Sequence, residues 1–158
     1  MIKISIITIN FNNQLGLEKT ILSVINQTIK PFEYIIIDGG STDGSKEIIE
    51  SYSQSIQFWV SETDHGVYHA MNKGIEKATG DYLLFLNAGD RLYQNETIER
   101  VLSKMEDNVD LYYGDTEYEE PSRPNYIKYY PNILDFNYFY NFNISTSLAS
   151  LKERYFIL

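Results

Sequence analysis

The chain alternates short apolar runs with segments in which apolar residues recur at helical spacing. Residues 2–9 form a nearly continuous β-branched run, which predicts a buried strand. Further strands are predicted at 34–37, 56–60, 82–86 and 109–113, and helices at 15–27, from 41–43 to about 52, at 67–78 and at 96–105. This alternation predicts an α/β fold with a mostly parallel sheet flanked by helices.

Glycine and small polar residues mark the turns of this pattern. Gly39 and Gly40 predict a tight turn after the second strand. Residues 41–43, Ser-Thr-Asp, have the chemistry of a helix N-cap, and Asp43 is expected to pin the loop by accepting backbone N–H bonds. Gly80 is expected as the C-cap of the helix at 67–78.

Three polar stretches follow predicted strands, at 10–13, 38–43 and 87–90. Because ligands of parallel α/β sheets bind beyond the carboxyl ends of the strands, we expect these stretches to converge on one edge and form a site. Taken singly, two of them have simpler interpretations. The stretch at 38–43 also fits a turn with a helix cap, and the one at 87–90 fits a plain turn.

The carboxylates in these stretches indicate the chemistry of the site. Asp38 ends a buried strand, where it can accept hydrogen bonds from a base or a ribose. Asp90 can hold Mg²⁺ or Mn²⁺, which prefer oxygen ligands and often take one or two carboxylates plus substrate phosphates. Such an ion would neutralise a leaving diphosphate.

The stretch at 62–74 enters a helix whose N-terminal amides can face a phosphate. Lys73 can add a cation there, although a solvated lysine on a surface helix explains it equally. His65 and His69 have i, i+4 spacing, but no third ligand accompanies them, so we do not assign them to a metal.

Composition narrows the class of protein. The length of 158 residues suits one domain, and the absence of cysteine excludes disulfides and thiolate metal sites. The net charge of -9 argues against nucleic acid as a partner. No apolar run reaches the ~20 residues of a membrane span, so we expect a cytoplasmic location. Neither a dinucleotide-binding Gly-x-Gly-x-x-Gly nor a Walker A sequence is present.

The ordered set of motifs resembles the family 2 glycosyltransferases of the GT-A fold. The matching segments are 5–13, 23–28, 35–44, 70–75 and 80–90, and the similarity covers about residues 2–115. The pieces at 68–74 and 86–90 look like a subgroup from bacterial capsule and exopolysaccharide synthesis. The resemblance implies transfer of a sugar, with inversion, from a nucleotide diphosphate sugar, commonly of uridine, to an acceptor hydroxyl.

The resemblance also implies residue roles. Phe11 stands where the family often stacks an aromatic ring on uracil, Asp38 matches the carboxylate that hydrogen-bonds the base, and Asp90 ends the family's Asp-x-Asp metal motif. The nucleotide-binding residues implied in this way are Thr8, Asn10, Phe11, Asp38, Gly40, Asn72, Lys73 and Asn87, and Asp90 is the implied ligand of Mn²⁺ or Mg²⁺.

The sequence departs from the family pattern at several positions. Gly39 replaces a common second Asp, Met71 stands where many relatives have an Arg, and Asn87 and Gly89 replace the usual metal carboxylates. These changes predict a metal that is weakly bound or dispensable. We interpret the chain as C-terminally truncated, because the family's acceptor region and catalytic base lie further on. No catalytic base is named: the carboxylates Asp110, Asp115 and Glu117 are present, but none matches the family's base position.

We therefore divide the chain into a nucleotide-sugar-binding core at 1–115 and an aromatic-rich C-terminal part of the same domain at 116–158. The second part opens with Glu117, Glu119 and Glu120, which precede an exposed loop predicted at 121–124. Its aromatic residues are Tyr126, Tyr129, Tyr130, Phe136, Tyr138, Phe139, Tyr140 and Phe142. They favour core packing of a final hairpin or helix. The alternative is an exposed patch that forms a homodimer, or contacts the inner face of the membrane or a lipid-linked or saccharide acceptor.

Three functions remain open from sequence. The leading one is a glycosyltransferase core for surface polysaccharide. The second is a catalytically incomplete module that binds a nucleotide sugar or another subunit. The third, a sugar nucleotidyltransferase, is disfavoured because no Gly-rich basic phosphate loop follows the first strand.

Overall fold

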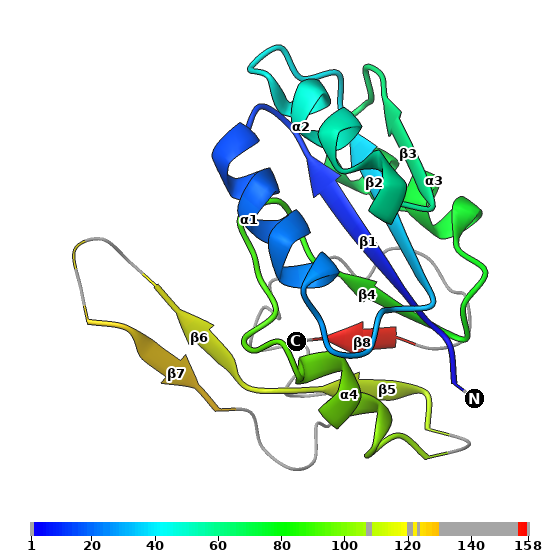
Figure 1. The fold of residues 1–158 in the computed structure, drawn as a ribbon, viewed down its shortest axis with the longest axis vertical. Coiled ribbons are helices and arrows are strands. Elements are labelled where there is room, and N and C mark those ends of the chain that lie inside the picture. The colour runs from blue at the N-terminus through cyan, green and yellow to red at the C-terminus, as the bar shows by residue number, and fades with distance from the viewer. Residues whose placement is uncertain (1, 107–108, 120–121, 123, 130–154, 158) are drawn as a thin grey trace.

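The computed structural model describes residues 2–106, 109–119, 122, 124–129 and 155–157. Its main sheet has six parallel strands in the order β3-β2-β1-β4-β8-β5 (Figure 1). The strands of this sheet are β1 (Ile4–Asn10), β2 (Glu33–Asp38), β3 (Phe58–Ser61), β4 (Tyr82–Phe85), β5 (Leu111–Tyr113) and β8 (Tyr155–Ile157). The helices are α1 (Gln14–Ile25), α2 (Ser45–Ser51), α3 (Val67–Lys77) and α4 (Thr97–Leu102), with a short 3₁₀ turn η1 (Ser53–Ser55).

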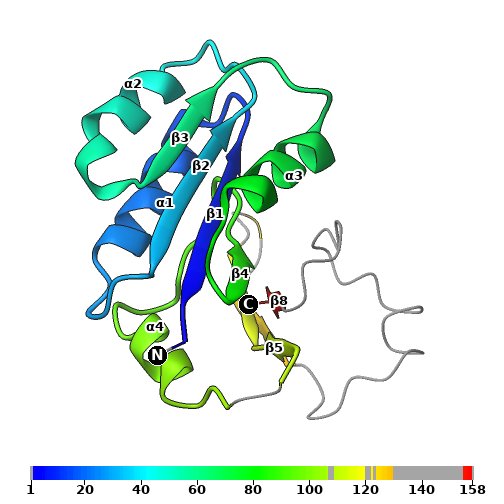
Figure 2. The same ribbon diagram turned by 90° about the vertical axis from the view of Figure 1, so that its right-hand side faces the viewer.

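Helices cover both faces of the sheet, with α1 and α2 on one side and α3 on the other (Figure 2). The alternation of side chains along a strand explains the two cores. Ile4 and Ile6 of β1 pack with Leu17 of α1, whereas Ile7 and Ile9 pack with the α3 side. Because both faces of β1 and β2 are buried, these strands are apolar throughout most of their length, as parallel strands generally are.

The predicted order of strands and helices is confirmed as far as β5, with boundaries displaced by a few residues. One strand of the main sheet was not predicted. Residues 155–157 form β8, which lies between β4 and β5 and pairs in parallel with both. A three-residue strand is too short to show a periodic pattern, so the sequence carried no signal that would place it inside the sheet.

The predicted helix caps were wrong in two places. The N-cap of α2 is Gly44, at φ 96°, rather than one of residues 41–43. Asp43 still pins the loop as expected, since its carboxylate accepts the backbone N–H groups of Gln14 and Ser45. The helix α3 has its C-cap at Ala78, and Gly80 instead lies against β1. A Cβ atom at Gly80 would stand 2.4 Å from the Ser5 hydroxyl oxygen, so close approach, not capping, requires this glycine.

A separate antiparallel pair, β6 (Thr116–Tyr118) and β7 (Tyr126–Lys128), projects from the main sheet (Figure 1). Glu117, in the acidic run that precedes the predicted loop, lies in β6 opposite Ile127. The rings of Tyr118 and Tyr126 stack with their centroids 5.0 Å apart. Tyr126 and Tyr129 are exposed, so the core-packing prediction was wrong for these two.

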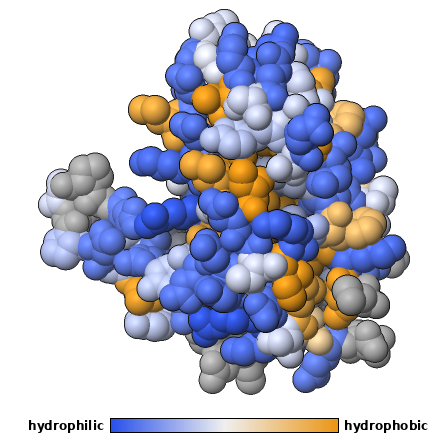
Figure 3. All heavy atoms as spheres, in the orientation of Figure 1, coloured by the Kyte–Doolittle hydropathy of each residue, from blue (hydrophilic) through white to orange (hydrophobic). Residues whose placement is uncertain are grey.

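The remaining aromatic residues of that prediction, at 130–142, lie outside the described residues. Within the described part of the chain, no helix is both long enough and apolar enough to cross a membrane. On the face drawn in Figure 3, hydrophobic residues occur as separate groups among hydrophilic ones. The two buried hydrophobic clusters lie between the sheet and its helices.

Candidate functional site

Three loops meet at the carboxyl edge of the sheet, beyond β1, β2 and β4. Asn10 and Asp38 are register partners, and the Asn10 side-chain amide donates to the Asp38 carboxylate at 2.7 Å. On the other side, the Asn13 side-chain amide donates to the carbonyl of Ala88 at 2.9 Å. The predicted convergence of 10–13, 38–43 and 87–90 is thus confirmed, with the first loop bridging the other two.

Asp38 is fully buried and accepts hydrogen bonds from four groups. The donors are the Asn10 amide, the Ser41 backbone N–H, the Ser41 hydroxyl and the Ser61 hydroxyl, at 2.5–2.9 Å. Burial raises the pKa of this carboxyl, but the hydrogen bonds from Ser41, Ser61 and Asn10 outweigh it and hold the pKa below its ordinary value. Asp38 is therefore ionised and ties together β1, β2 and β3.

The loop after β1 is clasped to the loop after β2. The Asn12 backbone N–H donates to the Ser41 hydroxyl at 2.8 Å, and the Asn12 side-chain oxygen accepts the Thr42 N–H at 2.9 Å. Asn12 adopts a positive φ of 49°, which asparagine tolerates better than most residues. This clasp fixes the neighbouring Phe11, whose side chain remains 67% exposed.

Phe11 and Asp64 both lie close to Gly39. A Cβ atom at Gly39 would stand 3.2 Å from Phe11 Cδ2 and 2.9 Å from Asp64 Oδ2. Gly40 has a φ of 81°, and a Cβ there would lie 3.0 Å from the Thr63 nitrogen. The two glycines thus let the loop after β3 approach the ring of Phe11. The sequence did not single out Asp64, because an acidic residue in a polar loop carries no distinctive signal.

The turn at 87–90 is shaped by its own backbone and by α1. Gly89 has a φ of 106°, and the Asp90 N–H donates to the Asn87 carbonyl at 2.9 Å. The buried hydroxyl of Thr20 accepts the Gly89 N–H at 2.9 Å and donates to the Asp90 carbonyl at 2.6 Å. Asp90 is an exposed residue, but its carboxyl is partly buried, and this burial raises its pKa. A backbone hydrogen bond at Asn87 lowers the pKa by a smaller amount.

Two side-chain amide oxygens at this edge are buried and have no hydrogen-bond partner among the described residues. They belong to Asn10, the last residue of β1, and to Asn87, in the turn that follows the neighbouring strand β4. Buried polar atoms are generally paired, so an unpaired one in a native fold calls for a partner outside the chain. Both atoms belong to residues that the sequence assigned to the nucleotide site.

The predicted residues on α3 are placed differently from one another. Asn72 is exposed, whereas Lys73 forms an ion pair with Glu62 at 2.7 Å. The hydrogen bond and charge of Lys73 lower the pKa of Glu62. Met71, which stands where many relatives have an Arg, is fully buried in the core below α3. A phosphate at Lys73 would therefore have to compete with Glu62.

Thr8 lies inside the protein rather than among the loops. Its side chain is fully buried, and its hydroxyl is 3.1 Å from the hydroxyl of Tyr34. Burial raises the pKa of the Tyr34 phenol well above its ordinary value, so this pair is neutral. The structure thus brings Asn10, Phe11 and Asp38 together with Asn87 and Asp90, while Thr8 supports β1 from within.

The residues available for a metal are few. Among the described residues, no group of three His, Cys, Asp or Glu side chains is placed to hold an ion. The two histidines contact each other, with the His65 N–H donating to His69 Nδ1 at 3.3 Å. At the carboxyl edge, Asp90 and the unpaired amide oxygen of Asn87 are hard oxygen donors. They fit a divalent cation that takes its other ligands from phosphate and water.

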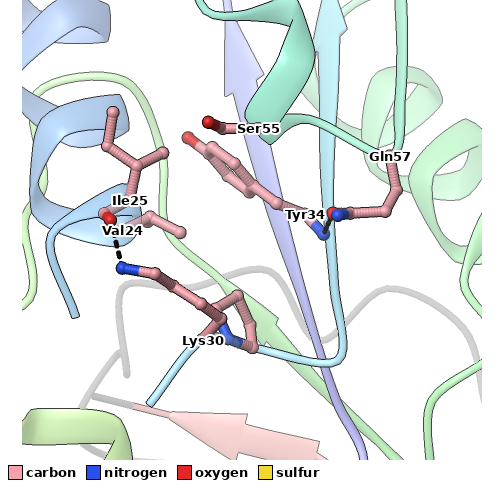
Figure 4. Close-up of a pocket in the computed structure, with 7 residues that line it drawn as sticks. Val24, Ile25, Lys30, Tyr34, Ser55 and Gln57 are labelled. Carbon is pink, nitrogen blue, oxygen red and sulfur yellow. Dashed lines mark hydrogen bonds between the residues drawn. The ribbon is translucent and has the colours of Figure 1, made fainter. Parts of the chain in front are cut away.

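A cavity of about 160 Å³ lies at the opposite end of β2 (Figure 4). Its lining comprises Val24, Ile25, Lys30, Pro31, Tyr34, Ser55 and Gln57. The only cation in this lining is Lys30, and its ammonium already donates to the Ile25 and Gln27 carbonyls at 2.5 and 2.8 Å. Because Tyr34 lies near the start of β2 and Asp38 at its end, this cavity is separate from the edge that carries the predicted site.

Comparison with known proteins assigns the chain to a family. The sequence model of glycosyl transferase family 2 matches residues 5–154. A PGL/p-HBAD biosynthesis glycosyltransferase of Mycobacterium tuberculosis is 41% identical over 98 residues, which are 59% of this chain and 38% of that protein. The chain therefore matches well under half of the length of this curated relative.

Solved structures show the same fold. The structure of Staphylococcus aureus TarS 1-349 in complex with UDP-GlcNAc matches with a TM-score of 0.65 at 21% sequence identity. The match covers 78% of this chain and 37% of the TarS chain. The Pyrobaculum calidifontis mannosyltransferase PcManGT, in complex with GDP-Man and Mn²⁺, matches with a TM-score of 0.64 at 18% sequence identity. This match covers 73% of this chain and 36% of the PcManGT chain. The predicted GT-A architecture is confirmed, and the chain belongs to glycosyl transferase family 2.

Proposed function

We propose that this chain forms the donor-binding part of a glycosyltransferase that uses a nucleotide diphosphate sugar. The observation that carries the proposal is that an exposed aromatic ring and an exposed carboxylate lie on linked loops at one edge of the sheet. An exposed aromatic ring, Phe11, lies beside Gly39, and the turn that presents Asp90 is attached to the same loop through Asn13. A flat apolar surface and a carboxylate are the two features that a base and a metal-bound diphosphate need.

The nucleoside half would be formed by Phe11, Gly39 and Asp64. A base stacked on an aromatic side chain gains ~1–3 kcal/mol in single-stranded nucleic acid complexes, and the same contact is available here. Asp38 would act through the loop that it organises, because its own oxygens already accept four hydrogen bonds. Uridine is the base we propose, in line with the UDP-GlcNAc complex of TarS.

The diphosphate half would be formed by Asp90, with the Asn87 amide oxygen as a second donor and Mn²⁺ or Mg²⁺ as the ion. When bound, the ion would neutralise charge on the departing diphosphate. The PcManGT complex with GDP-Man and Mn²⁺ supports this arrangement by analogy. The ammonium group of Lys73 would also bind the diphosphate, after leaving its ion pair with Glu62.

In the proposed reaction, the bond between the sugar C1 and the diphosphate oxygen breaks while the acceptor oxygen attacks C1 from the opposite face, with inversion. The acceptor proton passes to a general base, and the electron pair of the broken bond stays on the diphosphate. We assign no described residue as that base. The acceptor we propose is a saccharide or a lipid-linked saccharide at the inner membrane face, in surface polysaccharide synthesis.

The experiment is a calorimetric titration of the chain with UDP, and with GDP as the comparison nucleotide, in the presence and absence of Mn²⁺. We expect saturable UDP binding that Mn²⁺ strengthens. In Asp90→Ala we expect the strengthening to disappear while the metal-free affinity is retained. Asp110→Ala, which removes an exposed carboxylate outside the three loops, is the matched control and should behave as the wild type.

Two outcomes separate the alternatives. A folded chain that binds neither nucleotide would contradict the proposal. Binding of UDP without release of UDP from a UDP-sugar and acceptor would favour the second candidate, a nucleotide-sugar-binding module without turnover. That candidate is supported by Asp38, whose engagement in four intramolecular hydrogen bonds makes the edge a stable binding platform in the absence of catalysis.

A further inference from the structure

A stripe of three polar residues, on α1 and just beyond its end, contacts the chain that follows β4. Thr20 and Ser23 lie at positions i and i+3 of α1, and therefore on one helix face, and Gln27 lies two residues beyond the last residue of the helix. This face also carries the buried apolar residues Leu17 and Val24. Thr20 is fully buried and Gln27 is 2% exposed. Apolar residues would suffice for packing at these positions, so the polar side chains must serve another purpose.

The hydroxyl of Thr20 bonds the backbone on both sides of the Gly89–Asp90 pair, at the Gly89 N–H and at the Asp90 carbonyl. It accepts the Gly89 N–H at 2.9 Å, and its nearest carbonyl acceptor is that of Asp90 at 2.6 Å. The carbonyls of Gly16 and Asn87 lie further away, at 3.1 and 3.3 Å. A threonine inside a helix usually donates back to the carbonyl of residue i−4. Here the shorter contact is instead the tertiary one.

The other two residues of the stripe continue this pattern along the chain. The Ser23 hydroxyl accepts the Leu92 N–H at 3.2 Å. The Gln27 side chain accepts the Ile98 N–H at 2.9 Å and donates to the Gln94 carbonyl at 2.8 Å. Helix α1 and Gln27 beyond its end thus provide hydrogen bonds to a segment whose residues between Leu92 and Thr97 form neither helix nor strand.

The contact has a geometric consequence for the site. Gly89 is held at a φ of 106°, in a region where glycine moves freely between conformations. A single buried hydroxyl that bonds the N–H on one side and the carbonyl on the other removes that freedom. The direction of the Asp90 side chain follows from the backbone of this turn.

We propose that Thr20 is the positioning residue for Asp90, fixing the turn so that its carboxylate meets a metal-bound diphosphate. The inference rests on the proposed function, because it assigns Thr20 a role through the proposed metal ligand. Residues that orient a ligating carboxylate typically change metal affinity 10–100-fold when they are replaced. Ser23 and Gln27 act further along the chain, so their effect decreases with distance from Asp90.

The test compares Thr20→Val, which keeps the shape and removes the hydroxyl, with Thr20→Ser, which keeps the hydroxyl. The quantity measured is the Mn²⁺-dependent gain in UDP affinity, alongside the metal-free affinity and the Tm. We expect Thr20→Val to lower the gain about tenfold with the metal-free UDP affinity unchanged, and Thr20→Ser to restore it. A residue with only a structural role would lower the Tm without this split.

Thr79→Val is the matched control, since it removes a threonine hydroxyl that donates to Glu33, at the start of β2. It should leave the Mn²⁺-dependent gain intact. A folded Thr20→Val chain with the full wild-type gain would overturn the proposal, as would a Thr20→Ser chain that loses as much as Thr20→Val. If Thr20→Val does not fold, Thr20→Ala replaces it, because it also removes the hydroxyl: a gain lowered about tenfold supports the proposal, and a folded chain with the full wild-type gain overturns it.

Failure of the proposed function is recognised separately, in the wild-type chain. A wild-type chain that binds UDP without any Mn²⁺-dependent gain overturns both the metal site and the role of Thr20. A wild-type gain that survives in Thr20→Val overturns the role of Thr20 alone and leaves the metal site standing.

Discussion

The two carboxylates at the carboxyl edge of the sheet have opposite environments. Asp38 is fully buried, accepts four hydrogen bonds and has its pKa held below the ordinary value. Asp90 is exposed, has its pKa raised, and is held through its backbone by Thr20. The first carboxylate is therefore part of the framework, whereas the second is presented to the exterior.

This difference teaches that equal placement at strand ends does not imply an equal role. Asp38 is the last residue of β2, and Asp90 is the last residue of the turn that follows β4. What separates them is the supply of protein donors around each one. Asn10 at the end of β1 and Ser61 at the end of β3 each provide one donor to Asp38, and Ser41 of its own turn provides two. The carboxylate of Asp90 lies on an exposed residue.

The largest expected effect is on stability, in Asp38→Ala. The change leaves the Asn10 amide and the hydroxyls of Ser41 and Ser61 without their acceptor. Each buried donor left unpaired costs about 1–3 kcal/mol, so we expect the free energy of unfolding to fall by about 3 kcal/mol or more. Chemical denaturation monitored by the fluorescence of the single tryptophan measures it. Asp110→Ala, at an exposed position, should change it by less than ~0.5 kcal/mol.

The same variant has a defined pH dependence. Because the folded pKa of Asp38 is lowered, its contribution to stability is fully present above the unfolded pKa of about 3.9 and is lost as the pH falls through the folded pKa. The difference between wild type and Asp38→Ala should therefore be constant from about pH 7 to 5 and shrink below about pH 4. A difference that grows on acidification would contradict the framework role.

A smaller effect, confined to ligand binding, is expected in Phe11→Ala. The ring is 67% exposed, so its loss should change the stability little. If a base stacks on it, the UDP affinity should fall about tenfold, in the range of one base–aromatic contact. Phe32→Ala removes another exposed phenylalanine, near the start of β2, and should leave the affinity unchanged. Equal affinities in wild type and Phe11→Ala would remove Phe11 from the site.

The smallest effect is expected in Gly39→Ala. The added methyl group would meet Asp64 Oδ2 at 2.9 Å and Phe11 Cδ2 at 3.2 Å, and both are ends of side chains that can shift. We expect a stability loss below ~1 kcal/mol and a UDP affinity reduced only a few-fold. Calorimetry on this variant sharpens the assignment of the nucleoside half. A variant that binds UDP more tightly would show that the glycine does not serve to leave room for the base.

Much of the fold could be predicted because it depends on local pattern. The apolar runs of β1 and β2 and the alternation with helices are visible in the sequence, and they imply the convergence of the loops at residues 10, 38 and 90. The strand β8 could not be predicted, because its place between β4 and β5 is decided by pairing over a long separation rather than by its three residues.

The candidate site could be predicted by position but not by the state of each side chain. The burial of Asp38 depends on Ser61, which comes from a different strand, and the pairing of Lys73 depends on Glu62 in a loop. Thr20 could have been noticed as a polar residue at helical spacing among Leu17, Ile21 and Val24. Its partners at 87–90 lie about seventy residues away, so only the tertiary structure identifies them.

The measurement that tests the central claim most directly is the ¹H–¹⁵N correlation NMR spectrum of the ¹⁵N-labelled chain, first with UDP and then with Mn²⁺ added. We predict that UDP shifts the backbone amide signals around Phe11, Gly39 and Asp64. Mn²⁺ should then broaden the amide signals of the turn that carries Asp90. Broadening around Tyr34 and the cavity at the other end of β2, or no change at the carboxyl edge, would contradict it.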